Sequence, residues 1–229
     1  MAPKDCDNGI DKAMPCDEDY IVLAEKAAKD IEHYCEDMSS WNDINMGDPA
    51  YKIFTRKSDT VEASEAMLML TTTLPASIDK LEKLLSFQYP YRLQWDEMLE
   101  NAEVIRKLPD EIYIIRHLVK KRLTLSARES IDVVKVLRKD DKMIFGSTGT
   151  THPQYPPVKG YVRTRQHLGG YYMKPNVADS SSTDFSMLFH ADLNLSAPRF
   201  VSSLVDRFKP KLMAEKIGNL RKAIVKFDI

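Results

Sequence analysis

The 229-residue chain has few glycines and cysteines and no long apolar run. Its eight glycines form no phosphate-binding loop, because the GSTGT stretch at 146–150 is followed by neither a predicted helix nor the lysine of a P-loop. The three cysteines all lie within the first 35 residues, and their odd number does not fit the disulfide framework of a secreted domain. The sequence therefore favours a reducing compartment and argues against a P-loop nucleotide site.

The chain also lacks charge of one sign. Its 33 basic and 34 acidic residues give a formal net charge of -1, so no overall attraction to nucleic acid is expected. The longest uncharged apolar-rich run, AMLMLTTTLPASI at 66–78, is shorter than the roughly 20 residues that span a bilayer. The N-terminal segment has no apolar signal region. We expect a cytoplasmic protein without a membrane anchor.

Hydrophobic periodicity predicts a mobile tail over residues 1–16 and one domain over 17–229. The domain begins with a helix over 17–38 and ends with a helix of about thirty residues, bent at Pro210. A short helix is predicted at 76–87, and a short helical or irregular segment at 94–100. Strands are predicted at 50–57, 65–73, 102–108, 111–119, 130–139, 142–149, 160–168, 170–175 and 183–193. The short links between strands predict an α+β fold with a large, curved antiparallel sheet and one long helix across it.

No catalytic or metal-binding constellation is visible. The five histidines lie on separate predicted elements, and none has the spacing of a helical zinc-binding pair. His190 and Asp192 alternate along a predicted strand and so share one of its faces, which fits either part of a metal site or, more simply, a polar outer face. No serine or cysteine lies in a Gly-flanked nucleophile elbow. We therefore expect no metal, no cofactor and no catalytic residue.

The predicted sheet carries more apolar residues than one buried face requires. Strands such as EIYIIRHLV at 111–119 have apolar side chains on both faces. Helices can cover one face, while the other encloses either an apolar cavity or a filled core, and the pattern fits both. The basic stretch at 117–128 is either a solvated face or a loop whose Leu123 and Leu125 contact an anionic membrane.

Five stretches together resemble one protein family. They are RLQWDE at 92–97, SARESID at 126–132, HPQYPPVKGYVRTRQHLGGYYMKP at 152–175, STDFSMLFHADLNLSAPRFVSSLV at 182–205 and NLRKAIVKF at 219–227. Their order and spacing from about Trp41 to Phe227 are similar to those of the START domain, the StAR-related lipid-transfer module. The resemblance is closest to the small, single-domain, sterol-type members of the cytosol.

The START resemblance implies a helix-grip fold, in which about nine antiparallel strands wrap around the C-terminal helix and enclose a cavity for one lipid molecule. It also implies a gate formed by the final helix and the loop at 120–127, with Leu123, Leu125 and Arg128 on the loop side. The ARES sequence departs from the more usual proline-containing form of this motif.

The resemblance also assigns ligand-binding positions, each with core packing as the alternative. Two polar cavity positions of the family fall at His117 and at Val134, where several relatives have an acid and an arginine. Arg116 and Asp132 are neighbours that could pair with each other or with the ligand, although Arg116 and His117 cannot both face the cavity on one strand. The remaining lining positions are Tyr113, Ile115 and Val136 from the sheet, and Met213, Ile217 and Leu220 from the final helix.

These observations lead to one functional prediction with several alternatives. We expect a monomeric lipid-binding and lipid-transfer protein that contacts membranes transiently, binds no nucleic acid, and has sterol as its leading ligand. Phospholipid, carotenoid, bile-acid-like steroid and fatty acyl lipids are alternative ligands, and a lipid sensor is an alternative role. The rival class is a hydrolase or cyclase on a similar fold that acts through His117 or His190.

Overall fold

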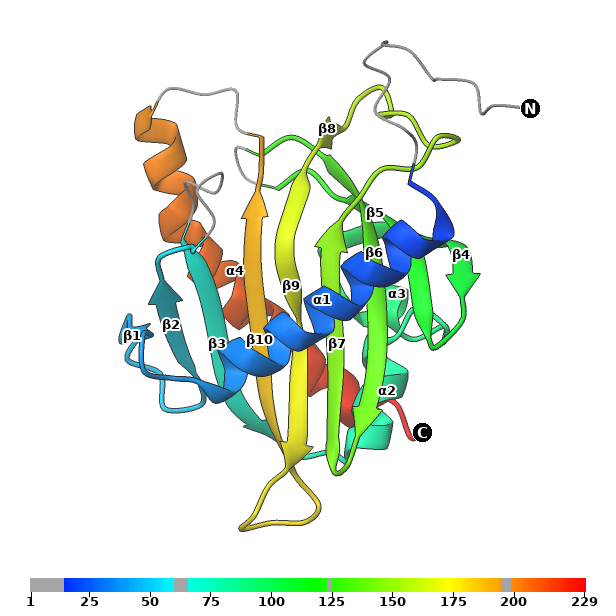
Figure 1. The fold of residues 1–229 in the computed structure, drawn as a ribbon. Coiled ribbons are helices and arrows are strands. Elements are labelled where there is room, and N and C mark those ends of the chain that lie inside the picture. Colours follow the sequence, from blue (N-terminus) through cyan, green and yellow to red (C-terminus); the bar gives the residue numbers. More distant parts are fainter. Residues whose placement is uncertain (1–14, 60–65, 123–124, 195–198) are drawn as a thin grey trace, which may run out of the picture.

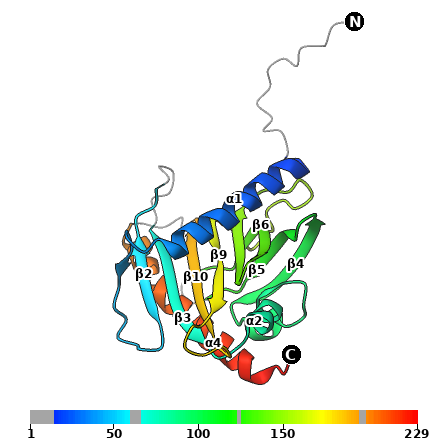
Figure 2. The same cartoon turned by 60° about the horizontal axis from the view of Figure 1, so that its bottom comes forward.

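A computed structural model describes residues 15–59, 66–122, 125–194 and 199–229, and shows one twisted sheet between two layers of helices (Figure 1). Helix α1 lies on one face, whereas α2 and α4 lie on the other (Figure 2), and α3 contacts α4. The helices are α1 (Asp17–Glu36), α2 (Ile78–Leu85), α3 (Arg92–Trp95) and α4 (Arg199–Lys226). The strands are β1 (Asn42–Asp43), β2 (Lys52–Arg56), β3 (Met67–Leu74), β4 (Leu99–Leu108), β5 (Ile112–Val119), β6 (Arg128–Lys139), β7 (Lys142–Gly149), β8 (Val162–Arg163), β9 (Arg165–Pro175) and β10 (Thr183–Asp192).

The sheet order is β1-β2-β3-β10-β9-β7-β6-β5-β4, and every neighbouring pair in it is antiparallel. The two-residue strand β8 adds a parallel pairing at the start of β6, with Arg128 opposite Val162. The predicted α+β class, with its large antiparallel sheet and long final helix, is confirmed. Of the predicted tail, residues 1–14 lie outside the described residues.

Helix α1 packs closely on the centre of the sheet because its inner face is made largely of small residues. Ala24, Ala27 and Ala28 are buried there, between the larger Tyr20 and Ile31. The acidic residues in its first turn interact favourably with the positive end of the helix dipole. Outer-face charges then join the helix to strands β6 and β7, for example between Glu25 and Lys135.

The opposite face of the sheet carries the larger core. Helix α2 begins after Ser77, whose hydroxyl accepts a hydrogen bond from the backbone N–H of Lys80 and so caps the first turn. Leu81, Leu84 and Leu85 on α2 pack with strand residues such as Ile53, and with apolar side chains of α4. Apolar residues therefore fill both faces of the sheet, as the two-sided strands predicted.

Two strand predictions were wrong at glycines. The Gly169–Gly170 pair was expected to break two strands, but both residues lie inside β9. A side chain at Gly170 would meet the carbonyl oxygen of Phe145 at 1.8 Å, so glycine is required here by the close approach of β7.

The predicted strand at 160–168 is instead divided between β8 and the start of β9. The segment at 94–100 is helical only to Trp95 and joins β4 at Leu99.

The expectation that His190 and Asp192 share an exposed polar face was also wrong. A β-bulge between His190 and Ala191 interrupts the alternation of β10 against β9. His190 is buried beside His167, with ring centres 4.8 Å apart, whereas Asp192 is exposed. Among the described residues, no group of three His, Cys, Asp or Glu side chains could hold a metal ion.

Candidate functional site: an internal cavity

A cavity of about 300 Å³ lies between the sheet and the layer of α3 and α4. We call it the main cavity, and its lining is predominantly apolar. The sheet contributes Tyr113, Ile115, His117, Val119, Arg128, Ser130, Asp132, Val134, Val136, Phe145, Ser147, Gln166, Gly170, Tyr171, Met187, Leu188, Phe189 and Ala191. Leu99 at the start of β4 also lines it. Other segments contribute Leu85, Ser86, Phe87, Gln88, Arg92, Asp96, Met98, Leu125, Thr164, Leu193, Lys209, Leu212, Met213 and Lys216. Its size is at the lower end of ordinary ligand pockets.

Most of the predicted lining residues lie at the main cavity. They are Tyr113, Ile115, His117, Asp132, Val134, Val136 and Met213, although contact with a ligand stays a prediction. Ile217 and Leu220 do not line it, which corrects that part of the expectation. Both are almost fully buried in the core, because they lie one and two turns beyond Met213 on the same face of α4, where this helix packs on α2. The apolar pattern of a helix does not distinguish its core-facing residues from its cavity-facing ones.

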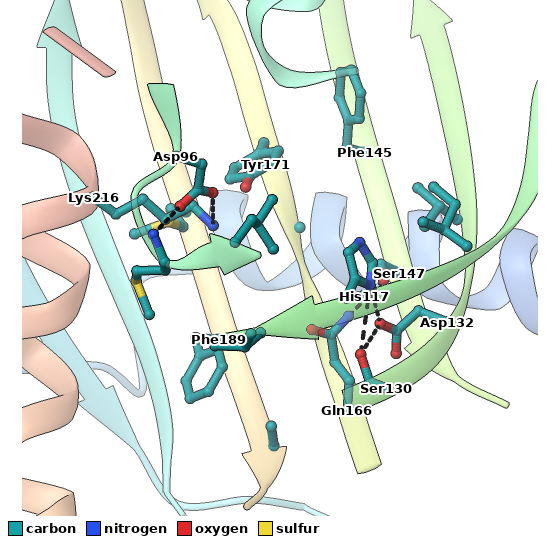
Figure 3. A pocket seen from close by; sticks show the side chains of 18 of the residues that line it. Asp96, His117, Ser130, Asp132, Phe145, Ser147, Gln166, Tyr171, Phe189 and Lys216 are labelled. Atoms are coloured by element: carbon teal, nitrogen blue, oxygen red, sulfur yellow. Dashed lines mark hydrogen bonds and ion pairs between the residues drawn. The ribbon is translucent and has the colours of Figure 1, made fainter. Parts of the chain in front are cut away.

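His117, Ser130 and Asp132 form a polar cluster inside the main cavity (Figure 3). Nδ1 of His117 lies 2.8 Å from Oδ2 of Asp132, and the Ser130 hydroxyl donates to the same oxygen at 2.7 Å. Because a carboxylate accepts, Nδ1 of His117 is the donor in this contact. The second oxygen of Asp132 is buried and has no hydrogen-bond partner in the described part of the chain. It is the acceptor that a ligand hydroxyl can satisfy.

Strand alternation decides between Arg116 and His117. His117 faces the main cavity, and its ring packs edge-on against Phe87 at a centre distance of 4.9 Å. Arg116 lies on the opposite face, where it pairs with the fully buried Glu129 at 3.4 Å. The suggested pairing of Arg116 with Asp132 was therefore wrong, because consecutive strand residues point to opposite faces.

A second ionic cluster, which the sequence analysis missed, joins α3, β9 and α4. The Asp96 carboxylate lies 2.9 Å from the guanidinium of Arg92 and 3.3 Å from the amine of Lys216. Arg92 also donates to the hydroxyl of Tyr171 at 2.8 Å. Burial alone would raise the pKa of Asp96, but Lys216 and Arg92 lower that pKa to about 2. The available signal was the spacing of Arg92 and Asp96, one helical turn apart in RLQWDE.

At the end of the main cavity near the β5–β6 loop lies a second pocket, which we call the outer hollow. Met98, Val119, Leu125, Arg128 and Leu212 line both spaces. The remaining lining of the outer hollow is Glu97, Lys120, Lys121, Arg122 and Ser126. Leu123 lies outside the described residues.

The loop and the helix of the expected gate are joined by an ion pair. Arg122 on the β5–β6 loop pairs with Glu215 on α4, and both side chains are about one-third exposed. Leu125 is half-buried and faces the two pockets, so it is not a fully exposed apolar tip. The loop and α4 therefore lie against each other beside the shared end of the two spaces.

Comparison with known proteins assigns the family. The model of the START domain matches residues 22–223, which is nearly the whole chain. The chain belongs to the START family. Its match begins within α1, which extends the sequence-based resemblance toward the N-terminus.

Individual START proteins support this assignment. StAR-related lipid transfer protein 5 of Homo sapiens is 31% identical over 139 residues, which cover 59% of this chain and 64% of that protein. The alignment thus spans slightly less than two thirds of that relative's length. StAR-related lipid transfer protein 6 of Homo sapiens is 21% identical over 90% of this chain and 92% of its own. The solved structure of human StAR-related lipid transfer protein 5 has a TM-score of 0.82 at 24% identity, covering 91% of this chain and 97% of its own, which confirms the helix-grip fold.

Proposed function

We propose that this START protein binds one lipid molecule in the main cavity and transfers it between membranes, with a sterol as the leading ligand. The observation that carries the proposal is the main cavity itself, an apolar space with a small polar cluster. The names of the related START proteins, StAR-related lipid transfer proteins 5 and 6, support the same role.

A protein of this shape lowers the barrier that keeps lipids in a membrane. Transfer of a lipid of about 27 carbons into water costs on the order of 20 kcal/mol of free energy, at about 0.8 kcal/mol per methylene. An apolar cavity that opens at the membrane offers the lipid a comparable environment throughout the transfer. No covalent step is needed for this activity.

The polar cluster suits a hydroxyl group at the end of an apolar ligand. A sterol hydroxyl can donate a hydrogen bond to the unpartnered oxygen of Asp132, while His117 and Ser130 hold the carboxylate in place through its other oxygen. Leaving a buried carboxylate oxygen without a donor is costly, so a ligand that supplies one gains affinity. This favours a sterol over a lipid whose tail lies beside Asp132.

The same geometry favours a carrier over a hydrolase that would use Ser130 as its nucleophile. A serine nucleophile needs a base that accepts its proton, but Ser130 donates to Asp132 at 2.7 Å and lies 3.5 Å from Nδ1 of His117. That nitrogen is already engaged by Asp132. The arrangement therefore positions a carboxylate acceptor and does not activate Ser130.

The proposal places the opening at the β5–β6 loop and α4, because the two spaces meet there. We expect the protein to be a monomer that works in the cytoplasm and contacts membranes transiently. The odd number of cysteines fits the reducing conditions of that compartment. In the described residues, no helix combines the length and apolarity that crossing a bilayer requires.

The central test is lipid binding followed by transfer. Native mass spectrometry of protein purified from cells should show a 1:1 complex with a lipid, and purified protein should accelerate movement of a fluorescent sterol between vesicles. Binding of a phospholipid, carotenoid or fatty acyl lipid in place of sterol would replace the leading ligand. Binding without faster exchange would support a lipid sensor and contradict transfer.

The role of Asp132 is tested by a matched pair of ligands, cholesterol and the same hydrocarbon without its hydroxyl. We expect Asp132→Ala to weaken cholesterol binding about tenfold or more, because a hydrogen bond to a charged group contributes about 1.5–3 kcal/mol. The hydroxyl-free ligand should bind the variant at least as well as it binds the unmodified protein. Dissociation constants are measured by displacement of a fluorescent sterol.

The control for Asp132→Ala is Val134→Ala, which removes apolar contact two residues further along β6 and leaves the polar cluster intact. It should weaken both ligands by the same factor. If Asp132→Ala also weakens both ligands equally, Asp132 does not recognise the hydroxyl.

A further inference from the structure

Arg128 is a buried cation for which the described residues provide no carboxylate partner. Its side chain is 9% exposed at the first position of β6, and it lines both the main cavity and the outer hollow. Its guanidinium donates to two backbone carbonyls, those of Ser126 and Leu193. In the described part of the chain, no acidic group lies within ion-pair distance of it.

Two other buried cations each have a carboxylate partner. Arg92 pairs with Asp96, and Lys135 pairs with Glu25. An arginine stays protonated in proteins even where burial lowers its pKa, as burial does for Arg128. A buried charge is costly unless it is paired, so the site of Arg128 is electrostatically incomplete.

The position of Arg128 on β6 places this charge at one end of the ligand space. Arg128, Ser130, Asp132, Val134 and Val136 alternate along the strand, and all face the main cavity. At about 3.3 Å per residue, the Cα atoms of Arg128 and Asp132 are about 13 Å apart. The lining therefore changes from cationic beside the outer hollow, through polar, to apolar at Val134 and Val136.

We propose that Arg128 binds the anionic group of an amphipathic lipid, a carboxylate, sulfate or phosphate, whose apolar body lies in the main cavity. The planar guanidinium suits these oxyanions, because it can offer two parallel N–H donors. This inference rests on the proposed function, since it requires a lipid in the main cavity. Among the lipids considered above, it selects those that carry an anionic group. For a sterol, this means a derivative with an acidic group.

The experiment measures dissociation constants for two pairs of probes that differ in charge, oleate against oleyl alcohol and cholesterol sulfate against cholesterol. The unmodified protein should prefer the charged member of at least one pair. Arg128→Gln should weaken that charged probe about tenfold to a hundredfold, the range expected for a hydrogen bond to a charged group. The neutral probe should change by less than about twofold. Arg128→Lys, which keeps the charge, should recover part of the loss.

Lys159→Gln is the matched control, because it removes the same charge from an exposed position that lines neither the main cavity nor the outer hollow. It should leave all four dissociation constants unchanged. Equal weakening of charged and neutral probes by Arg128→Gln would mean that Arg128 acts through the Ser126 and Leu193 carbonyls, and would overturn the inference. The inference would also be overturned if Arg128→Gln bound all four probes as before but no longer bound phosphatidylserine vesicles. Arg128 would then contact the anionic headgroups of a membrane and not a ligand in the main cavity.

The outcomes also separate this inference from the proposed function. Neutral probes that bind without any preference for their charged partners would overturn the anion site and leave lipid binding intact. Failure of all four probes to bind would contradict both.

Discussion

At the scale of single residues, Gly146 sets how closely α1 approaches the sheet. A Cβ atom at this position of β7 would lie 2.3 Å from the backbone nitrogen of Ala28 on α1. Non-bonded heavy atoms do not approach each other this closely, so a side chain here would push the helix away. Gly146 therefore has a packing role, and the small residues of α1 complete the contact from the other side.

We predict that Gly146→Ala lowers the free energy of unfolding by about 1–3 kcal/mol, the usual cost of overpacking a core. The control is Gly218→Ala in α4, where a Cβ would meet nothing within 4 Å. In a helix, this same substitution should raise the free energy of unfolding by up to about 1 kcal/mol, because alanine has the higher helix propensity. Urea unfolding of both variants measures the difference. A stable Gly146→Ala variant would show that α1 can shift without cost.

Residue-scale predictions from the sequence succeeded where strand alternation alone decides the outcome. Tyr113, Ile115 and His117 share a face by counting, and the structure places all three at the main cavity. Counting could not show that Arg116 pairs with Glu129, because that choice depends on the loop that covers the opposite face. Nor could it separate Met213, at the cavity, from Ile217 in the core.

At the scale of elements, the Arg122–Glu215 ion pair is a direct link between the β5–β6 loop and α4. Both groups are about one-third exposed, so water and salt weaken their attraction. A link of this strength can hold the two elements together without preventing them from separating, which is what a gate requires.

Reversing charges in the Arg122–Glu215 pair tests the gate. Arg122→Glu replaces attraction with repulsion, and we expect lipid release to accelerate by about fivefold, since exposed pairs contribute up to about 1 kcal/mol. Adding Glu215→Arg restores an opposite-charge pair and should bring the rate back toward that of the unmodified protein. The measurement is transfer of a fluorescent sterol from protein to excess uncharged phosphatidylcholine vesicles. Equal rates in all three proteins would remove this contact from the gating mechanism.

Element boundaries show where the sequence was insufficient. The long helices and most strands follow from periodicity, but the Gly169–Gly170 pair looks like a turn and lies inside β9. Its glycines are needed because the backbone of β7 passes so near, which is a tertiary effect that no local pattern contains. The β-bulge at His190 is similar, since one additional residue changed which side chains of β10 are buried.

At the scale of the whole molecule, the Asp96 cluster joins three parts of the fold. Arg92 and Asp96 come from α3 and the residue after it, Tyr171 from β9 and Lys216 from α4. The cluster also lines the main cavity, so the ionic contacts that hold α4 lie beside the proposed ligand site. Loss of the Asp96 charge should therefore affect both global stability and the closure of the cavity.

Acid titration tests this coupling. The pKa of Asp96 is lowered from 3.8 to about 2, so its stabilising contribution is complete above about pH 4 and is lost as the pH falls toward 2. That shift corresponds to about 2 kcal/mol of unfolding free energy. Asp96→Asn should lower stability at pH 7, because Arg92 and Lys216 remain buried or partly buried without their carboxylate. It should also flatten the decline of stability between pH 4 and 2.

The control is Asp140→Asn, at an exposed turn position with a positive φ that asparagine also tolerates. It should leave the slope of stability against pH unchanged. Chemical unfolding at several pH values measures the slope. The same slope in Asp96→Asn as in the unmodified protein would show that the cluster does not couple protonation to folding.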